Sequence, residues 1–90
     1  MFRMRNNIVG TRVRAARIAY RPRMTQSDLA IKLQLDSWDI GRSGVAKIEL
    51  GLRTVTDVEV AKLAKALGVS IAWLFDPDAS PLSSEAKECT

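Results

Sequence analysis

The hydrophobic positions of the chain recur at helical spacing over most of its length, with polar and charged residues between them. The clearest stripe repeats at i, i+3, i+4 and i+7 and consists of Val60, Leu63, Ala64 and Leu67. A repeat near 3.6 residues is typical of a helix with one buried face, whereas a half-buried strand alternates every two residues. The pattern predicts helices in five segments: 9–20, 26–34, 42–50, 57–67 and 71–75. The residues expected to face the core from the first three segments are Val9, Val13, Ala16, Tyr20, Leu29, Ala30, Leu33, Val45 and Ile48. The predicted fold class is therefore all-α.

Hydroxyl side chains mark the starts of three of these helices. Thr25 is followed three residues later by Asp28, which is the spacing of a shortened capping box. In that motif a hydroxyl and a carboxylate satisfy N–H groups that have no partner at the helix start. The same spacing separates Thr56 from Glu59, and Ser70 precedes the short fifth segment. These residues predict helix starts near residues 26, 57 and 71.

Proline and glycine mark where the helices end. Pro22 interrupts the first helix, because proline lacks an N–H donor and its ring clashes with the preceding turn. Gly51 and Gly68 follow the last apolar positions of their helices, where a left-handed residue commonly ends the helix. The stretch from residue 35 to 41 has turn chemistry and breaks the helical period.

Composition narrows the chemistry available to the chain. Ninety residues are enough for one domain. The chain has no histidine, and its one cysteine is Cys89, which excludes histidine general bases, an internal disulfide framework and cysteine or histidine metal sites. No apolar run reaches the roughly 18 residues that cross a bilayer, and the N-terminus lacks a signal-like apolar stretch. We expect a cytoplasmic protein that is not an enzyme and has no metal, cofactor or small-molecule substrate.

The charge of the chain is unevenly distributed. Its 14 lysines and arginines outnumber 10 acidic residues, for a net charge of +4. Residues 76–90 contain four acids and one lysine, so residues 1–75 carry a net charge of +7. A basic body of this size favours a polyanionic partner, with nucleic acid ahead of an anionic membrane surface. We expect a flexible basic N-terminus at 1–7, a folded domain at 8–75 and a disordered acidic tail at 76–90.

Three sequence motifs, in this order, carry a resemblance to a known family. They are TQSDLAIKL at 25–33, RSGVAKIELG at 42–51 and LAKALGVS at 63–70. Together they resemble the phage-repressor and Cro-like helix-turn-helix regulators of the XRE type, over roughly residues 8–75. The resemblance implies a five-helix Cro/repressor-like domain that binds double-stranded DNA, with its third helix in the major groove. Two connections depart from the family pattern: the turn through 36–40 is about five residues longer, and the link around 21–23 about two residues longer.

The resemblance also selects the residues that contact DNA. Arg42 has the chemistry to donate two hydrogen bonds to guanine, and Lys47 to donate to guanine or to a phosphate. The positions implied to face the bases are Arg42, Ser43, Gly44, Ala46 and Lys47. The positions implied to contact phosphates are Thr25, Gln26, Gly41 and Arg53. Gln26 lies at a helix start, where free N–H groups and the helix dipole favour an anion.

An acidic residue in a helix that meets DNA needs an explanation. The resemblance pairs Glu49 with Arg17 of the first helix, in an ion pair that ties the recognition helix to the rest of the domain. The other interpretation is an exposed glutamate on the surface of that helix.

Aromatic and N-terminal basic residues leave alternatives open. Trp38 lies in the lengthened turn, where it packs across the junction of two helices or contacts the sugar-phosphate backbone. Trp73 and Phe75 belong to the core or to a dimer interface, because aromatic clusters that stay exposed mark interfaces. Arg3 and Arg5 form a minor-groove arm or are solvated charges on a flexible end.

The function favoured by these observations is that of a bacterial or phage transcription regulator, most simply a repressor that binds DNA as a homodimer. The alternative is a protein-interaction module, such as an antitoxin or adaptor, that uses the Trp73 and Phe75 end. A membrane-surface role is disfavoured, because the first helix has a narrow, alanine-containing apolar stripe.

Overall fold

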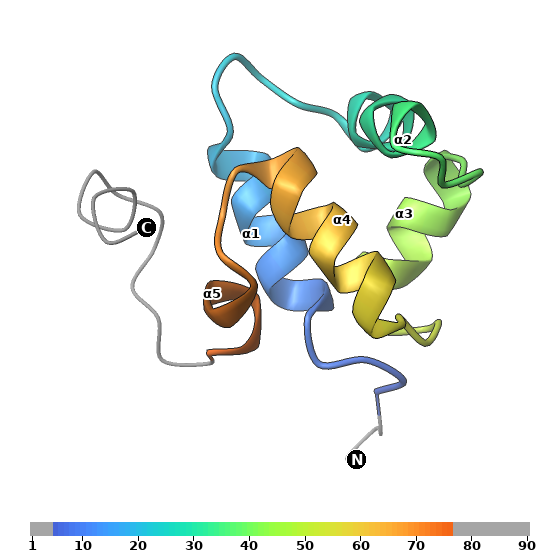
Figure 1. The fold of residues 1–90 in the computed structure, drawn as a ribbon, viewed down its shortest axis with the longest axis vertical. Coiled ribbons are helices and arrows are strands. Elements are labelled where there is room, and N and C mark those ends of the chain that lie inside the picture. The colour runs from blue at the N-terminus through green and yellow to red at the C-terminus, as the bar shows by residue number, and fades with distance from the viewer. Residues whose placement is uncertain (1–4, 77–90) are drawn as a thin grey trace.

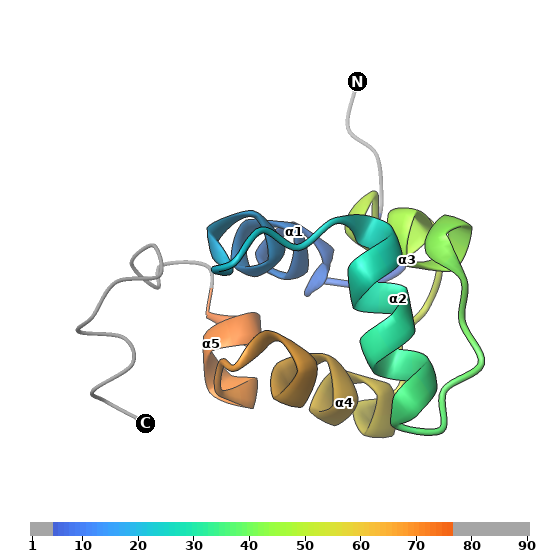
Figure 2. The same cartoon turned by 90° about the horizontal axis from the view of Figure 1, so that it is seen from above.

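A computed structural model describes residues 5–76, which form five helices (Figure 1). The helices are α1 (Gly10–Ala19), α2 (Gln26–Leu35), α3 (Arg42–Glu49), α4 (Asp57–Leu67) and α5 (Ile71–Phe75). Figure 2 shows α1 and α4 on opposite sides of the bundle, with α5 closing one end and α2 the other. α3 packs against both α1 and α2. The all-α prediction is confirmed for the described residues, none of which lies in a strand.

The core is built from the apolar stripes of the helices. Each helix contributes buried side chains, and so do the connections on either side of α2. The buried apolar residues are Val9, Val13, Ala16, Met24, Leu29, Ala30, Leu33, Trp38, Ile40, Val45, Ile48, Val60, Leu63, Ala64, Leu67 and Leu74. All the predicted inward positions are among them except Tyr20, which is partly buried and packs against the cluster. None of the helices in residues 5–76 has the length and apolar character of a membrane span.

The predicted helix starts carry the predicted caps. Thr25 Oγ1 accepts a hydrogen bond from the Asp28 N–H at 3.1 Å, and the Asp28 carboxylate accepts one from the Thr25 N–H at 2.9 Å. Thr56 and Glu59 form the equivalent capping box at the start of α4. The Ser70 hydroxyl accepts the Trp73 N–H at 3.0 Å at the start of α5. These local hydrogen bonds fix where three of the five helices begin.

The two predicted glycine stops are confirmed, whereas α1 ends at Ala19 and α2 at Leu35, one residue before and one residue after the predicted ends. Gly51 and Gly68 adopt left-handed backbone angles with φ of 76° and 70°. After α3, the Leu52 N–H donates to the Lys47 carbonyl and the Gly51 N–H to the Ile48 carbonyl, which is a Schellman motif. The α3 helix ends at Glu49 with Leu50 as its cap residue, one residue earlier than the predicted end at residue 50.

The long turn between α2 and α3 is folded against the domain. Trp38 and Ile40 are both buried in the core cluster. The Trp38 N–H donates to the Leu33 carbonyl at 3.0 Å, and Gln34 Nε2 donates to the Ile40 carbonyl at 2.7 Å. Ser37 has a positive φ of 64°, which lets the chain reverse directly after α2. Of the two interpretations of Trp38, the structure shows the one in which it packs across the junction of α2 and α3.

The N-terminal segment differs from the expected flexible end. Residues 5–7 are hydrogen bonded along the end of α3 and the loop that follows it. The Asn6 N–H donates to the Gly51 carbonyl at 2.9 Å, and Asn6 Nδ2 donates to the Leu52 carbonyl at 3.0 Å. Arg5 Nη2 donates to the Glu49 carbonyl at 3.2 Å, so Arg5 is not a free arm. Residues 1–4 with Arg3, and residues 77–90 of the predicted tail, lie outside the described residues.

Asn7 is the centre of this docking. Its buried side chain donates from Nδ2 to the Ile48 carbonyl at 3.1 Å and to the Arg53 carbonyl at 2.8 Å. Its Oδ1 accepts the Gly10 N–H at 2.8 Å, which satisfies a free donor at the start of α1. One amide therefore joins the start of α1, the end of α3 and the loop before α4.

We expect Asn7→Ala to lower the free energy of unfolding by about 1–2 kcal/mol, because it leaves buried backbone groups without partners and removes a cap. Chemical denaturation measures this change. The matched control is Asn6→Ala, since Asn6 keeps its backbone hydrogen bond to Gly51 and its side-chain bond to Leu52 is exposed. Equal destabilisation by the two substitutions would contradict the role given to Asn7.

Candidate nucleic-acid interface

The outward face of α3 is basic and free of acidic side chains. Val45, Ile48 and Glu49 are buried, which turns the opposite side of the helix to solvent. Among the positions expected to face bases, Arg42, Ser43 and Lys47 are exposed and Ala46 is half-buried. These four share one face, because they are spaced at i, i+1, i+4 and i+5 along α3. The structure therefore groups them on one surface.

The structure gives a packing reason for glycine at position 44, which the sequence alone did not show. It is half-buried, and a Cβ at this position would lie 2.6 Å from Ile40 Cγ1. No other side chain fits without moving Ile40, which is packed in the core. Gly44 thus accommodates the lengthened turn, so a close approach to DNA is not needed to explain a glycine here.

Glu49 joins α3 to the rest of the domain. Its carboxylate accepts hydrogen bonds from Arg17 Nε at 2.6 Å and from Arg17 Nη2 at 3.1 Å. The side chains of Arg17 and Glu49 are only 13% and 3% exposed. Arg17 Nη1 also donates to the Met24 carbonyl at 3.2 Å. The two residues that the resemblance selects for this pair are therefore in contact, and the acid of α3 is withdrawn from its outer face.

Gln26 completes the same cluster at the start of α2. Its Nε2 donates to Glu49 Oε1 at 3.0 Å, so the cluster ties α1, α2 and α3 together. The first-turn N–H groups of Gln26 and Ser27 have no intrahelical partner and face the start of the helix. Hydrogen bonds from the backbone and side chain of Thr25, and the charge of Arg23, hold the pKa of Asp28 below its ordinary value. Thr25 is the cap of this helix, so its hydroxyl oxygen already accepts one bond.

Arg53 lies in the connection between α3 and α4 and has partners within the protein. Its guanidinium is 5.6 Å from the centre of the Trp38 ring, and its Nη2 is 3.5 Å from Glu59 Oε2. Its side chain is 34% exposed, which leaves part of the guanidinium accessible to solvent. Gly41, the cap residue of α3, offers no side-chain cap to the first turn of that helix. Of the phosphate positions implied by the resemblance, Thr25 and Gln26 lie at the start of α2, Gly41 is the cap residue of α3, and Arg53 follows α3.

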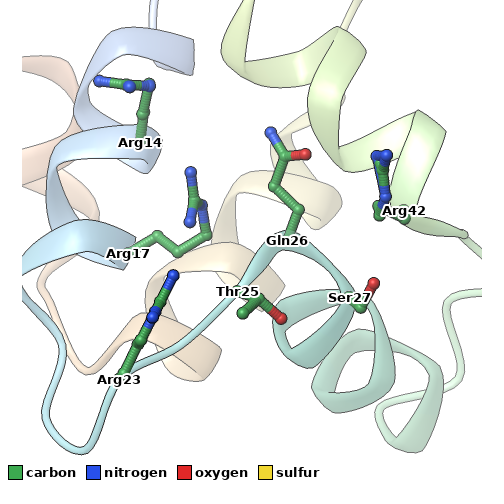
Figure 3. A pocket seen from close by; sticks show the side chains of 7 residues that line it. All are labelled: Arg14, Arg17, Arg23, Thr25, Gln26, Ser27 and Arg42. Carbon is green, nitrogen blue, oxygen red and sulfur yellow. The ribbon is translucent and has the colours of Figure 1, made fainter.

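An open basic cleft of about 560 Å³ lies between α1, α2 and α3. Figure 3 shows the side chains of Arg17 and Gln26 in the middle of this cleft, Arg42 on the α3 side, and two further arginines on the α1 side. The residues lining it are Arg14, Arg17, Arg23, Thr25, Gln26, Ser27 and Arg42. The Arg17 charge is compensated by Glu49, whereas Arg14, Arg23 and Arg42 form no ion pair within the described residues. Arg23 nevertheless lies close enough to Asp28 for its charge to lower the pKa of that carboxyl. The cleft is suited to an anion.

The α5 residues divide between core and surface. Leu74 is the fully buried residue of the helix, while Phe75 is 45% exposed. Trp73 is half-buried and packs against the core, and the Arg12 guanidinium lies 3.8 Å from the centre of its ring. Trp73 and Phe75 therefore do not form one exposed aromatic cluster, and Phe75 is the more accessible of the two.

Comparison with known families decides the class of this protein. A family model described as Helix-turn-helix matches residues 13–74, which is more than half of the chain. The chain belongs to the XRE-type helix-turn-helix family. The domain is accordingly that of a DNA-binding transcription regulator. Comparisons with curated proteins and with solved structures gave no match.

Two arginines that line the basic cleft were not singled out from the sequence as site residues. Arg14 and Arg23 line the cleft beside Gln26, although the family motifs do not include them. A signal was present, since Arg14 lies three residues before Arg17 on the same side of α1.

Proposed function

We propose that this protein is a transcription repressor that binds double-stranded DNA in a sequence-specific manner and acts in the cytoplasm. In this proposal α3 enters the major groove with its first turns facing the base edges. The observation that carries the proposal is the separation of charge on α3. Glu49 is buried against Arg17 and Gln26, while Arg42 and Lys47 remain exposed.

The base-reading residues proposed are those on the exposed side of α3. Arg42 donates to guanine O6 and N7, Lys47 to a guanine or a phosphate, and Ser43 to a base edge. Ala46 is half-buried on the same face and presents a methyl group suited to contact with thymine. Gly44 lies beside Ile40, and its part in base contact is limited to its backbone.

The phosphate-binding residues proposed lie at the start of α2 and at the two ends of α3. Thr25 and Gln26 belong to the start of α2, which provides N–H groups for a phosphate oxygen. The N–H of Gly41 precedes α3, and the guanidinium of Arg53 follows it. Arg53 exchanges its 3.5 Å contact with Glu59 for a phosphate when DNA is bound. Such contacts position the protein and do not read sequence.

We further propose that the protein binds its operator as a homodimer. One recognition helix contacts few base pairs, and a second copy related by a two-fold axis doubles the recognised site. The accessible apolar side chains of α5, Phe75 and Ile71, support self-association at this end. Trp73 contributes less, because it is held under Arg12.

The second candidate function is that of a protein-interaction module that masks a partner. The same exposed Phe75 and Ile71 favour it. Purified protein, free of partners, discriminates between the two functions. A transcription repressor shifts DNA from upstream of its own gene under these conditions, whereas a module that works only through a partner does not.

The proposal is tested by selecting bound duplexes from random DNA and measuring affinity by fluorescence anisotropy over a series of salt concentrations. We expect a two-fold symmetric consensus and a linear fall of log K with log salt concentration, by about 0.9 for each neutralised phosphate. Gln26→Ala and Arg53→Ala are expected to weaken binding to all DNA sequences by the same factor. Absence of any enriched sequence, or binding that is insensitive to salt, would refute the proposal.

A further inference from the structure

The cleft beside α2 contains more positive charge than the helix-turn-helix contacts use. Arg14 and Arg23 line it on the α1 side, away from the base-reading residues of α3 (Figure 3). Both side chains are exposed, and neither forms a hydrogen bond or an ion pair within the described residues. We propose that Arg14 and Arg23 form a subsite for a phosphate of the DNA backbone outside the groove occupied by α3. This inference rests on the proposed function.

The two arginines are held together by the elements on which they lie. Arg14 is one turn before Arg17 on α1, so the two side chains share a face of that helix. Arg23 lies between Pro22 and Met24, and Met24 is buried. The Met24 carbonyl accepts the hydrogen bond from Arg17 Nη1, which ties this part of the link to α1. The lengthened link therefore positions Arg23 beside the same cleft as Arg14.

The charges of the cleft leave these two arginines available to a ligand. Arg17, which lies between them in Figure 3, is committed to Glu49. Asp28, the acid of the first turn of α2, has its carboxylate bound to the Thr25 N–H. Arg23 lies close enough to Asp28 for its charge to lower the pKa of that carboxyl. The arginines of the cleft still outnumber these two acids, and the excess positive charge attracts an anion. Arginine binds a phosphate group with two parallel hydrogen bonds, as it does a carboxylate.

The shape of the site favours a strand of duplex DNA over a free phosphate ion. The cleft is open and about 560 Å³ in volume, and exposed side chains carry its charge. It is continuous with the start of α2 and with Arg42, which line the same cleft. A backbone that passes Gln26 therefore extends towards Arg14 and Arg23 without leaving the cleft. The footprint on DNA is accordingly longer than α3 alone requires.

Arg21 provides a matched control in the same link. Its Nη1 donates to the Ile18 carbonyl at 3.0 Å and to the Tyr20 carbonyl at 2.9 Å. It is exposed like Arg23, but it is not among the residues that line the basic cleft. Substitution of Arg21 removes the same unit of charge from the same segment of chain. If net charge alone controls DNA affinity, the Arg21 and Arg23 variants therefore lose affinity equally.

The test measures the salt dependence of binding to the selected duplex for Arg14→Gln, Arg23→Gln and Arg21→Gln. We expect the first two each to reduce the slope of log K against log salt by about 0.9, on specific and non-specific duplexes alike. Arg21→Gln is expected to leave the slope near that of the wild type. Equal slopes for the three variants overturn the subsite.

A second measurement locates the phosphate. Single phosphates of the duplex are replaced by uncharged methylphosphonates, and the affinity of each duplex is compared between wild type and Arg23→Gln. The subsite predicts one flanking phosphate at which the uncharged substitution weakens DNA binding by the wild type. The same substitution has little further effect on DNA binding by Arg23→Gln. A competition experiment compares inorganic phosphate with chloride at equal ionic strength. If phosphate displaces DNA better than chloride does, and only when both arginines are present, the site binds a free anion and the assignment to the DNA backbone is overturned.

The outcomes separate this inference from the function on which it rests. A wild-type protein that binds no duplex overturns both. The second outcome is a wild-type protein that binds a selected duplex with a steep salt dependence, while the Arg14 and Arg23 variants have the same salt slope as Arg21→Gln. This outcome overturns the subsite and leaves the proposed function intact.

Discussion

Glu49→Ala is expected to lower the free energy of unfolding by about 3–5 kcal/mol, the usual effect of removing one partner of a buried ion pair. The Glu49 side chain is 3% exposed and accepts hydrogen bonds from Arg17 and Gln26. Its loss leaves the largely buried Arg17 guanidinium without an opposite charge. It also removes the hydrogen bonds by which one carboxylate connects α1, α2 and α3. Chemical denaturation, followed by circular dichroism, measures the change.

The chain contains a second arginine–glutamate pair that serves as the control. Arg53 and Glu59 are 3.5 Å apart, and their side chains are 34% and 21% exposed. Glu59→Ala is expected to cost about 1 kcal/mol, including the loss of its capping bond to Thr56. If the two substitutions destabilise the protein equally, the cluster around Glu49 does not have the structural role given to it.

Arg42→Ala is expected to weaken binding to the best DNA site by about 1–3 kcal/mol and to relax the preference for one base pair. Arg42 is the first residue of α3, is exposed, and borders the cleft that contains the start of α2. An arginine at this position of a helix in the major groove reaches a guanine edge with two donors. Anisotropy titrations against the consensus duplex and its single-base variants measure both effects.

Arg21→Ala is the control for Arg42→Ala, because it removes the same charge from a side chain bound to the Ile18 and Tyr20 carbonyls. It is expected to leave the ranking of duplexes unchanged. A ranking that is equally unchanged by Arg42→Ala would show that another face of the protein reads the bases.

The helices and their boundaries could be predicted because their signals are local. Thr25 with Asp28, and Thr56 with Glu59, satisfy N–H groups only three residues away, so the sequence contains both partners of each bond. Gly51 is similarly recognisable, because the Schellman motif is complete within six residues of chain. The buried faces followed from the same short-range periodicity.

The docking of the N-terminus could not be predicted, because its partners are distant in sequence. Asn7 bonds to carbonyl groups 41 and 46 residues away, and a carbonyl is present on every residue. An asparagine near the end of a basic segment is equally typical of a flexible chain. The bonds that bury it depend on the close crossing of α1 and α3.

The candidate site was predicted as far as the family motif extends. The motif selected the residues of α3, of the start of α2 and of the Arg17–Glu49 contact. It did not supply the packing of Gly44 against Ile40, since Ile40 lies in the turn between α2 and α3, outside the motif residues. Nor did it supply Arg14 and Arg23, whose proximity depends on the lengthened link and on the Met24 carbonyl bound by Arg17.

The most direct test of the central claim is a titration of isotopically labelled protein with the selected duplex at low ionic strength, followed by amide chemical shifts. The account predicts that the largest shifts fall on residues 42–50, with smaller shifts at Gln26, Ser27 and Arg53, and that a scrambled duplex moves the α3 amides far less. If the amide chemical shifts of residues 42–50 do not change while the duplex saturates the protein, this account is contradicted.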